Sequence, residues 1–544
     1  MNNYKIFAFL TFFIAGSVQL ALAQDKIVHD AEYYVIEAQN GERWEAEDKT
    51  LDKRLAELKK KHGKAPNIIY ILWDDMAFGD AGIPAINKIR GFDTPQCNRM
   101  AEEGMMFTRM YSEPSCTPTR AASITGRHPV RNGMFIPGFP VENGGLAAAE
   151  VTTAEILSKA GYKTAFYGKS HLGDIEESYM TNQGFDEAFF TPYNQVLSLW
   201  NPIGEGANAV MGLMENQFPK SAYQLDNDFL PRGWILYLEG KKGEQVREWK
   251  LPSHDDYLAM DNESEKRTIE FIRANASETN PFFVCYWPQM TSFIASPQKT
   301  TQARGLLQEG FSKVDAFIGK VMDELNDLGI AENTLLIAMA DNGPMVHDPP
   351  PGLGMTETMF TGGKGDYTEG GVRVPAFAYW PGTIEAGSLA GDIIHVTDLY
   401  TTFARIGGAL EYIPTDRIID GIDQTSLLLN GDTYSRRDYV HIYTGKRLAA
   451  TVKAQYKQDW TRTIPGMVNT TFYDLQNDIR EKEPLMVPLL HFNASFVRMQ
   501  ERHEALKKKY PDQDQAHGPA FTGISNARPE TKNLEKLYNS YQKN

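Results

Sequence analysis

Cysteine is scarce in this sequence. The 544 residues include only three cysteines, Cys97, Cys116 and Cys285. Small exported domains are usually supported by a framework of paired cysteines, and three cysteines in a chain of this length exclude such a framework. At least one thiol stays unpaired. Stability must come from a hydrophobic core, for which a composition of 42% hydrophobic residues is sufficient.

Basic residues are outnumbered by acidic residues, and the formal net charge is −15. A protein that binds nucleic acid needs a basic surface against the phosphates, so we predict no nucleic-acid partner. A site for any anionic group must be built locally from a few basic side chains. Internal repeats and low-complexity tracts are absent as well, which excludes repeat architectures.

Long apolar runs are lacking beyond the N-terminus, so we predict a protein that is not embedded in a membrane. The one run, from Ile6 to Leu22, ends in the small-residue pattern Ala21-Leu22-Ala23. This pattern predicts a signal peptide over residues 1–23, cleaved near Ala23, and a periplasmic or secreted protein that begins near Gln24. An uncleaved anchor is the alternative, but the run is interrupted by polar and glycine residues and is barely long enough to span a bilayer.

Three further segments follow the predicted signal peptide. Residues 24–64 are rich in charge and have sparse apolar positions, which predicts an exposed leader with a helical end. Residues 65–435 alternate apolar strands with amphipathic helices, which is typical of an α/β domain with a mostly parallel central sheet flanked by helices. Residues 436–544 contain shorter segments and predict a smaller C-terminal α+β subdomain with a tail.

Acidic residues follow two of the predicted buried strands. Asp74 and Asp75 come directly after the apolar run 67–73, and Asp341 and Asn342 follow the run 334–340. Ligands collect at the carboxyl ends of strands in open α/β sheets, so both strand ends should face one site. One acid alone could cap a helix, but this oxygen-rich set favours a metal site for Ca²⁺ or Mg²⁺. Further elements are expected as strands at 164–167, 282–287, 374–379 and 439–443 and as helices after a capping box at Thr152 and Glu155 and over 312–328.

The segment Cys116-Thr-Pro-Thr-Arg120 is the most specific pattern in the chain. Pro118 suits the first turn of a helix, so Cys116 should lie at a helix N-terminus, where backbone N–H groups favour an anion. The alternative is a cysteine that is merely buried beside a helix start. The spacing by itself leaves both interpretations open.

Together with the Thr-Gly-Arg that follows, this segment resembles the signature of the formylglycine-dependent (type I) sulfatases, an arylsulfatase-like family of the alkaline phosphatase superfamily. The signature is Cys, any residue, Pro, any residue, Arg. The resemblance covers roughly residues 66 to 480, and its other motifs occur in order: Asp74-Asp75 with Phe78-Gly79-Asp80, Gly168-Lys-Ser-His-Leu-Gly173, Asp341-Asn-Gly343, Gly362-Gly-Lys-Gly, Glu369-Gly-Gly-Val-Arg-Val-Pro375 and Phe472-Tyr-Asp-Leu-Gln-Asn-Asp478.

The resemblance implies a sulfate ester hydrolase whose Cys116 is oxidised to formylglycine (3-oxoalanine) by a formylglycine-generating or sulfatase-maturating enzyme. The aldehyde hydrate offers two hydroxyls on one carbon. A serine that attacked sulfur would keep a stable sulfate ester, whereas the hydrate can reform the aldehyde and expel sulfate. The substrate would be a small-molecule or glycan sulfate ester.

The resemblance also implies roles for the other motif residues. The cation, Ca²⁺ or alternatively Mg²⁺, would be bound by Asp74, Asp75, Asp341, Asn342 and the modified Cys116. Arg120 would hold the modified side chain, Lys169 and Lys364 would bind sulfate oxygens, and His171 would take a proton as sulfate leaves. Without their motifs, each lysine would be interpreted as a surface residue and the histidine as structural. We expect Arg127, His128 and Arg131 to be packing and helix-end residues.

One position departs from the family pattern. Family members commonly carry a histidine just after the strand at 282–287, where it protonates the leaving alcohol. This chain has Trp287-Pro-Gln-Met-Thr-Ser-Phe-Ile294 instead. A good leaving group that needs no acid, replacement by Lys364, His254 or His347, and weak activity all remain open.

Two other functions remain open, and the missing histidine suggests the second of them. One is a phosphodiesterase or phosphonate monoester hydrolase of the same superfamily, although histidine-bearing motifs for a second metal are not evident. The other is a non-catalytic binder of sulfated glycans. Substrate recognition is expected between about residues 190 and 257, where aromatic side chains could stack on a ring or simply pack: Trp200, Tyr223, Trp234 and Tyr237.

Overall fold

The computed structural model describes residues 26–194, 236–249, 260–289, 306–344, 359–462, 471–485, 490–529 and 531–533. Among these residues, no helix is long and apolar enough to cross a membrane. The predicted signal peptide lies outside the described residues and stays a prediction. Three of the four aromatic residues singled out above, Trp200, Tyr223 and Trp234, also lie outside, as do His254 and His347.

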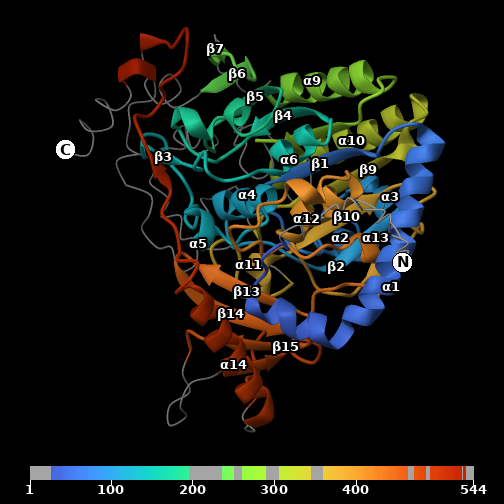
Figure 1. Ribbon diagram of the computed structural model, residues 1–544, viewed down its shortest axis with the longest axis vertical. Coiled ribbons are helices and arrows are strands. Elements are labelled where there is room, and N and C mark those ends of the chain that lie inside the picture. The colour runs from blue at the N-terminus through green and yellow to red at the C-terminus, as the bar shows by residue number, and fades with distance from the viewer. Residues whose placement is uncertain are drawn as a thin grey trace, which may run out of the picture.

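A large mixed sheet forms the centre of the molecule (Figure 1). Its order is β11-β2-β10-β9-β1-β8-β4-β5-β6-β7, with β12 also paired to β2. The central strands β9, β1, β8, β4 and β5 are mutually parallel, whereas β10, β6 and β7 pair antiparallel to their neighbours. The bounds are β1 Asn67–Trp73, β2 Met105–Tyr111, β4 Lys163–Lys169, β5 Glu187–Thr191, β6 Tyr237–Lys241, β7 Arg247–Trp249, β8 Phe282–Trp287, β9 Thr334–Ala340, β10 Arg373–Tyr379, β11 Ser388–Ala390 and β12 Ile394–His395.

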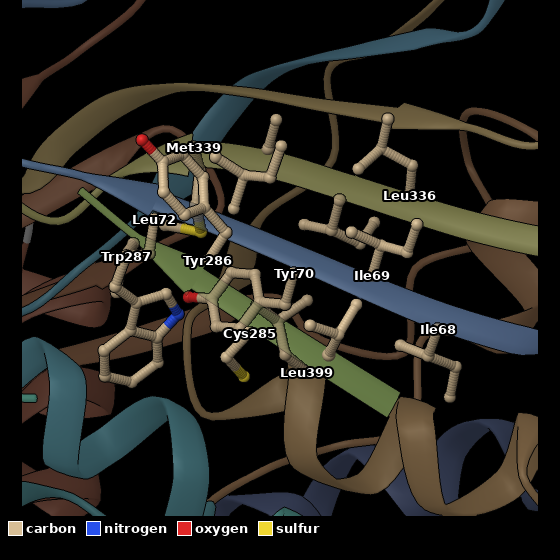
Figure 2. Close-up of a cluster of buried hydrophobic side chains, with 14 of the residues drawn as sticks. Ile68, Ile69, Tyr70, Leu72, Cys285, Tyr286, Trp287, Leu336, Met339 and Leu399 are labelled. Atoms are coloured by element: carbon tan, nitrogen blue, oxygen red, sulfur yellow. The ribbon is translucent and has the colours of Figure 1, made fainter. Parts of the chain in front are cut away.

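Helices cover both faces of this sheet, which confirms the predicted fold class. Every residue of β1, β8 and β9 is buried, as continuous apolar runs in a two-sided parallel sheet should be. On one face Tyr70 packs against Phe403 of α12, and on the other Tyr286 packs against Phe317 of α10. Figure 2 shows part of this packing, with Leu399 of α12 rising toward β1 and β8.

The helices of the main domain include the two predicted above. The capping box at Thr152 and Glu155 is present, and the predicted apolar stripe over 312–328 is buried along α10. The bounds are α2 Pro84–Ile89, α3 Pro95–Glu103, α4 Cys116–Thr125, α5 Pro129–Asn132, α6 Thr153–Lys159, α9 Met260–Asn275, α10 Leu306–Asp327, α11 Glu369–Val372, α12 Asp398–Ile406 and α13 Thr425–Asn430, with short 3-10 turns at Glu176–Ser178, Met180–Asn182, Ala331–Asn333 and Leu410–Tyr412.

A smaller antiparallel sheet follows in the C-terminal part of the chain. Its order is β13-β14-β15-β16, and helix α14, Leu490–Leu506, follows it in sequence. The bounds are β13 Tyr439–Thr444, β14 Arg447–Lys453, β15 Tyr456–Asp459 and β16 Thr471–Asp474, and a separate short pair joins β3 Gly144–Gly145 to β17 Ala516–His517. The C-terminal sheet agrees with the predicted subdomain, while the boundary at 435 stays a prediction.

The N-terminal segment corrects one prediction. We expected an exposed leader over 24–64, but Ala31–His62 forms a 32-residue helix, α1, that contacts α13 and α14 (Figure 1). Ile36, Trp44 and Leu51 are buried, and they recur at spacings of eight and seven residues, which place them on one helical face. Such a stripe has one apolar residue per two turns, so it is too sparse to stand out against the charged residues around it.

Truncating this stripe should destabilise the protein. Leu51 is fully buried against the main core, so Leu51→Ala should lower the free energy of unfolding by about 2–5 kcal/mol. Urea unfolding of the two proteins measures the difference. Lys53→Ala on the same helix is the matched control, because Lys53 is largely exposed and lies 4.0 Å from the equally exposed Glu57. Equal small effects of both substitutions would contradict the docking of α1.

Candidate active site

The ends of β1 and β9 lie side by side. Trp73 is paired with Ala340 in the parallel register, so the residues after each strand leave the sheet at the same level. The backbone N–H of Asp75 donates to Asp341 Oδ1 at 3.1 Å, and the backbone N–H of Asp341 donates to the carbonyl of Trp73 at 2.8 Å. The structure therefore brings together the acidic residues of the two strand ends, as the sequence predicts.

Arg120 occupies the centre of this acidic group. Its Nε and Nη2 donate to Asp341 Oδ2 at 3.2 and 2.9 Å, and Nη2 also donates to Asp74 Oδ1. Nη1 donates to the backbone carbonyl of Lys169 at 2.8 Å, and the guanidinium lies 5.1 Å from the ring centroid of Trp287. Burial alone would lower the pKa of Arg120, but Asp74 and Asp341 raise it, so the guanidinium is a fixed positive charge.

Two buried lysines complete the charge balance. Lys169 Nζ donates to Asp74 Oδ2 at 2.5 Å, and Lys364 Nζ donates to Asp75 Oδ1 at 2.5 Å. Burial opposes charge on every one of these groups, yet Lys169 holds the pKa of Asp74 well below its usual range, and Asp75 raises the pKa of Lys364. Burial and the neighbouring Asp74 raise the pKa of Asp341, while Arg120 and Lys169 act in the opposite direction. With all three carboxylates ionised, Arg120 and the two lysines balance their charge before anything binds.

Cys116 is the first residue of α4 and is buried. Ser115 precedes it as the N-cap in extended backbone, and Pro118 lies in the first turn of the helix, as the sequence predicts. A charge on Cys116 would raise the pKa of Arg120 and Lys364, which places the side chain within electrostatic reach of both cations. The side chain thus lies where a helix N-terminus and two fixed cations favour negative charge.

His171 approaches the site from the loop after β4. Its Nε2 is 2.9 Å from the carbonyl oxygen of Gly138, and its Nδ1 is buried without a hydrogen-bond partner among the described residues. Burial, reinforced by Lys169, places the pKa of His171 well below its usual value. The residue has a φ of 55°, a left-handed backbone conformation that is uncommon for residues other than glycine and found often at functional sites. The ring is therefore neutral and can accept a proton.

The donor set fits a hard divalent cation. Asp74, Asp75 and Asp341 offer carboxylate oxygens, and Asn342 Oδ1 is buried with no hydrogen-bond partner in the described part of the chain. A buried carbonyl oxygen without a donor carries a free-energy cost that a cation would remove. The oxygen ligands suit Ca²⁺ or Mg²⁺ better than a softer metal.

Several contributors to the site are missing from the sequence prediction. Asn194 Nδ2 donates to Asp74 Oδ2 at 3.3 Å, Thr119 Oγ1 donates to the carbonyl of Asp341 at 2.7 Å, and Trp287 lies under Arg120. Thr119 stands inside the cysteine motif and Trp287 at the end of a predicted strand. The positions of these two residues could have indicated that they lie near the site, although threonine and tryptophan do not by themselves indicate an active site.

Gln289 lies where the family's leaving-group histidine is expected. Its Nε2 donates to Thr191 Oγ1 and, at 3.2 Å, to the carbonyl of Tyr193, so the amide is fixed in place and buried. Of the three proposed replacements, Lys364 is in the site, whereas the two histidines lie outside the described residues. Tyr237 packs against Phe189 with ring centroids 4.4 Å apart and is fully buried, so it is a packing residue.

The fold and the site together define a class of enzyme. Carboxylates at the carboxyl edge of a parallel sheet, three fixed cations and a reactive position at a helix N-terminus are the parts of a hydrolase for anionic esters. The model of the sulfatase family matches residues 66–409. The chain belongs to the sulfatase family, and it is a sulfuric ester hydrolase.

Curated relatives agree with this assignment. The chain is 32% identical over 413 residues to N-acetylgalactosamine-6-sulfatase of Mus musculus, covering 73% of this chain and 72% of the relative. It is 29% identical over 455 residues to arylsulfatase G of Canis lupus familiaris, covering 78% and 82%. Sulfatases of this family generally use a formylglycine and a divalent cation.

Solved structures agree as well. The PsFucS1 sulfatase from Pseudoalteromonas sp. has a TM-score of 0.74 at 28% identity, covering 87% of this chain and 96% of that one. The phosphonate monoester hydrolase SpPMH from Silicibacter pomeroyi has a TM-score of 0.51 at 15% identity, covering 82% and 96%, which is a likeness of fold alone.

Proposed function

We propose that this chain hydrolyses sulfate monoesters with a formylglycine made from Cys116 and with Ca²⁺, or alternatively Mg²⁺, held by Asp74, Asp75, Asp341 and Asn342. The observation that carries the proposal is the contact of Arg120 with the carboxylates of both strand ends, on the helix that begins at Cys116. Export through the predicted signal peptide and maturation by a formylglycine-generating enzyme belong to the same proposal.

Each residue of the site has a distinct task. Arg120 holds the modified side chain against the carboxylates, and Lys169 and Lys364 donate hydrogen bonds to sulfate oxygens as charge moves onto them. The neutral His171 accepts the proton of the second hydroxyl when sulfate departs, through the Nδ1 that has no partner among the described residues. The bound cation would supply Lewis-acid polarisation of the sulfate group.

Charge balance supports the pairing of cation and substrate. Before binding, three carboxylates face Arg120 and two lysines. A divalent cation adds two positive charges and a sulfate monoester adds one negative charge, so the loaded site gains only one net charge. Each lysine can exchange its carboxylate for a sulfate oxygen once the cation binds that carboxylate.

The decisive experiment follows the chemical state of Cys116. Trypsin should release the peptide Met110–Arg120, since it cuts after Arg109 and Arg120. The protein is made with a formylglycine-generating enzyme, the peptide is weighed by mass spectrometry, and the release of sulfate from 4-nitrophenyl sulfate is assayed in the same batch. We expect an aldehyde at Cys116 and hydrolysis in proportion to its occupancy.

The same assay separates the alternatives. A plain thiol with no hydrolysis, but with binding of sulfated oligosaccharides, would favour the glycan binder. Faster cleavage of 4-nitrophenyl phosphonates or of bis-4-nitrophenyl phosphate than of the sulfate would favour the phosphonate or phosphodiester hydrolase. Competition by inorganic sulfate against inorganic phosphate gives an independent comparison of the two anions.

A further inference from the structure

Three buried side chains from distant parts of the chain meet beneath the small C-terminal sheet. Asp30 precedes α1, His441 is in β13 and His503 is in α14. Their exposed fractions are 2%, 1% and 0%, and one oxygen or ring nitrogen of each lies within 4.8 Å of the others. We call these residues the terminal triad. They take no part in the sulfatase site described above.

The contacts within the terminal triad are incomplete. His503 Nδ1 is 2.7 Å from Asp30 Oδ1, a hydrogen-bond distance. His441 Nε2 lies 3.7 Å from Asp30 Oδ2, which is too long for a hydrogen bond. Both of these atoms are buried, and neither has a hydrogen-bond partner within the described residues. Two unsatisfied polar atoms that face one another in a buried space carry a cost of folding that a bound ion would remove.

Hydroxyl groups hold the outer nitrogen of each imidazole. Tyr443 Oη is hydrogen-bonded to His503 Nε2, and Thr451 Oγ1 is 3.0 Å from His441 Nδ1. The Thr451 hydroxyl also accepts a hydrogen bond from Trp460 Nε1 at 2.9 Å, which fixes its position. Metal-binding histidines are usually oriented in this way, by a hydrogen bond to the nitrogen that does not bind the metal.

We propose that Asp30, His441 and His503 bind a Zn²⁺ ion that fastens the N-terminal segment to the C-terminal subdomain. Zinc with ligands at about 2.0–2.1 Å in tetrahedral geometry separates its ligand atoms by roughly 3.4 Å. In the structure His503 Nδ1 lies 2.7 Å from Asp30 Oδ1 and His441 Nε2 lies 3.7 Å from Asp30 Oδ2, so each nitrogen is near this spacing from a different oxygen of the carboxylate. Two imidazoles and one carboxylate suit Zn²⁺ rather than the hard cation of the sulfatase site.

The protons balance on zinc binding. In the neutral ring of His503 the Nδ1 proton is donated to Asp30; on zinc binding this proton would move to Nε2, so that the Nδ1 lone pair binds the metal and Nε2–H donates to Tyr443 Oη, with no proton lost from the ring. His441 Nε2 has no hydrogen-bond partner among the described residues and would offer its lone pair to the metal, while Nδ1–H donates to Thr451 Oγ1. Arg131 Nη2 donates to Asp30 Oδ1 at 3.2 Å, but Asp420 accepts from the same guanidinium at 3.1 and 3.0 Å and compensates its charge.

A second group of similar composition provides a matched control. Glu113, His128 and His395 are also buried and close together. There, however, His128 Nδ1 at 2.7 Å and His395 Nε2 at 3.7 Å both face the same oxygen of Glu113. In the terminal triad, by contrast, His503 and His441 face different oxygens of Asp30.

The test measures zinc in the full-length chain. Protein stripped with a chelator and dialysed against ZnCl₂ should retain about one zinc ion per chain by elemental mass spectrometry, and Co²⁺ should give the visible absorption of a tetrahedral site. Asp30→Asn and His503→Gln should lose this ion, Tyr443→Phe should weaken zinc binding about ten-fold, and His395→Gln should leave it unchanged.

Two results would overturn the proposal. One is wild-type protein that retains no zinc, and the other is a zinc content unaltered in Asp30→Asn or a zinc affinity unaltered in Tyr443→Phe. The second variant keeps the test sharp if Asp30→Asn does not fold, because it removes only one hydroxyl. Protein carrying Cys116→Ala should bind zinc normally, so failure here and failure of the sulfatase proposal are distinguishable.

Discussion

Cys116→Ala should reduce the turnover of 4-nitrophenyl sulfate by at least about 10⁴-fold, the scale on which enzymes lose activity when a covalent nucleophile is removed. The side chain is small and buried at the first position of α4, so alanine should preserve the helix and its N-cap. Michaelis–Menten kinetics should show the loss in kcat. Circular dichroism and thermal unfolding should remain close to those of the wild-type chain.

Two further variants show whether the loss of activity is specific to Cys116 and whether a single hydroxyl can replace the hydrate. Cys285→Ala removes another buried cysteine, in β8, and should keep the wild-type kcat because no motif places that residue in the chemistry. Cys116→Ser offers only one hydroxyl, so any attack on sulfur should leave the sulfo group attached to the peptide Met110–Arg120. Substantial turnover by Cys116→Ala would disprove the covalent route.

The central sheet was largely predictable from sequence. Residues 67–73 and 334–340 are continuous apolar runs followed by polar residues, and the structure has both as buried parallel strands in register. A strand that is buried on both faces does not alternate apolar with polar residues, so its sequence is a continuous apolar run that is easy to recognise. The helix α10 was predictable for the opposite reason, since its apolar residues repeat along one face.

The docking of α1 was not predictable in the same way. Its buried residues, Ile36, Trp44 and Leu51, appear only once in every two turns, and Arg405 binds the helix through Asp48 and Asp52. Arg405 lies more than 300 residues after these two aspartates in the chain. A charged helix that is held by distant ion pairs has the same local composition as a solvated one, so the pattern favoured an exposed leader.

The candidate site was predictable because its residues occur in ordered motifs, whereas the terminal triad was not. Asp30, His441 and His503 lie in no motif, and each would be interpreted alone as a structural residue. Only the packing of α14 and the N-terminal segment on the small sheet brings them together. The contacts of Gln289 with Thr191 and Tyr193 were not predictable either, because the absence of a histidine from the sequence does not show what the residue after β8 contacts.

Removing the divalent cation should abolish activity reversibly, and Asp75→Asn should weaken the response to added calcium. Asp75 Oδ1 accepts hydrogen bonds from Lys364 Nζ at 2.5 Å and from Asn342 Nδ2 at 2.7 Å, and its φ of 49° places it in a left-handed conformation at the strand end. Asparagine keeps the size and the carbonyl oxygen but removes one charge. We expect kcat/KM to fall on the order of 10³-fold, roughly 4 kcal/mol of transition-state stabilisation.

The measurement is a titration of calcium into chelator-treated enzyme, with the rate of sulfate release recorded at each concentration. The variant should need more calcium for half-maximal activity, since one of three carboxylate ligands is lost and Lys364 is left without its carboxylate. Asp80→Asn is the matched control, because Asp80 is a buried acid that pairs with Arg90. It should unfold at lower temperature yet keep the calcium response of the wild-type chain. An Asp75→Asn enzyme with an unchanged calcium midpoint would place the cation elsewhere, and full activity after chelation would exclude a cation from the reaction.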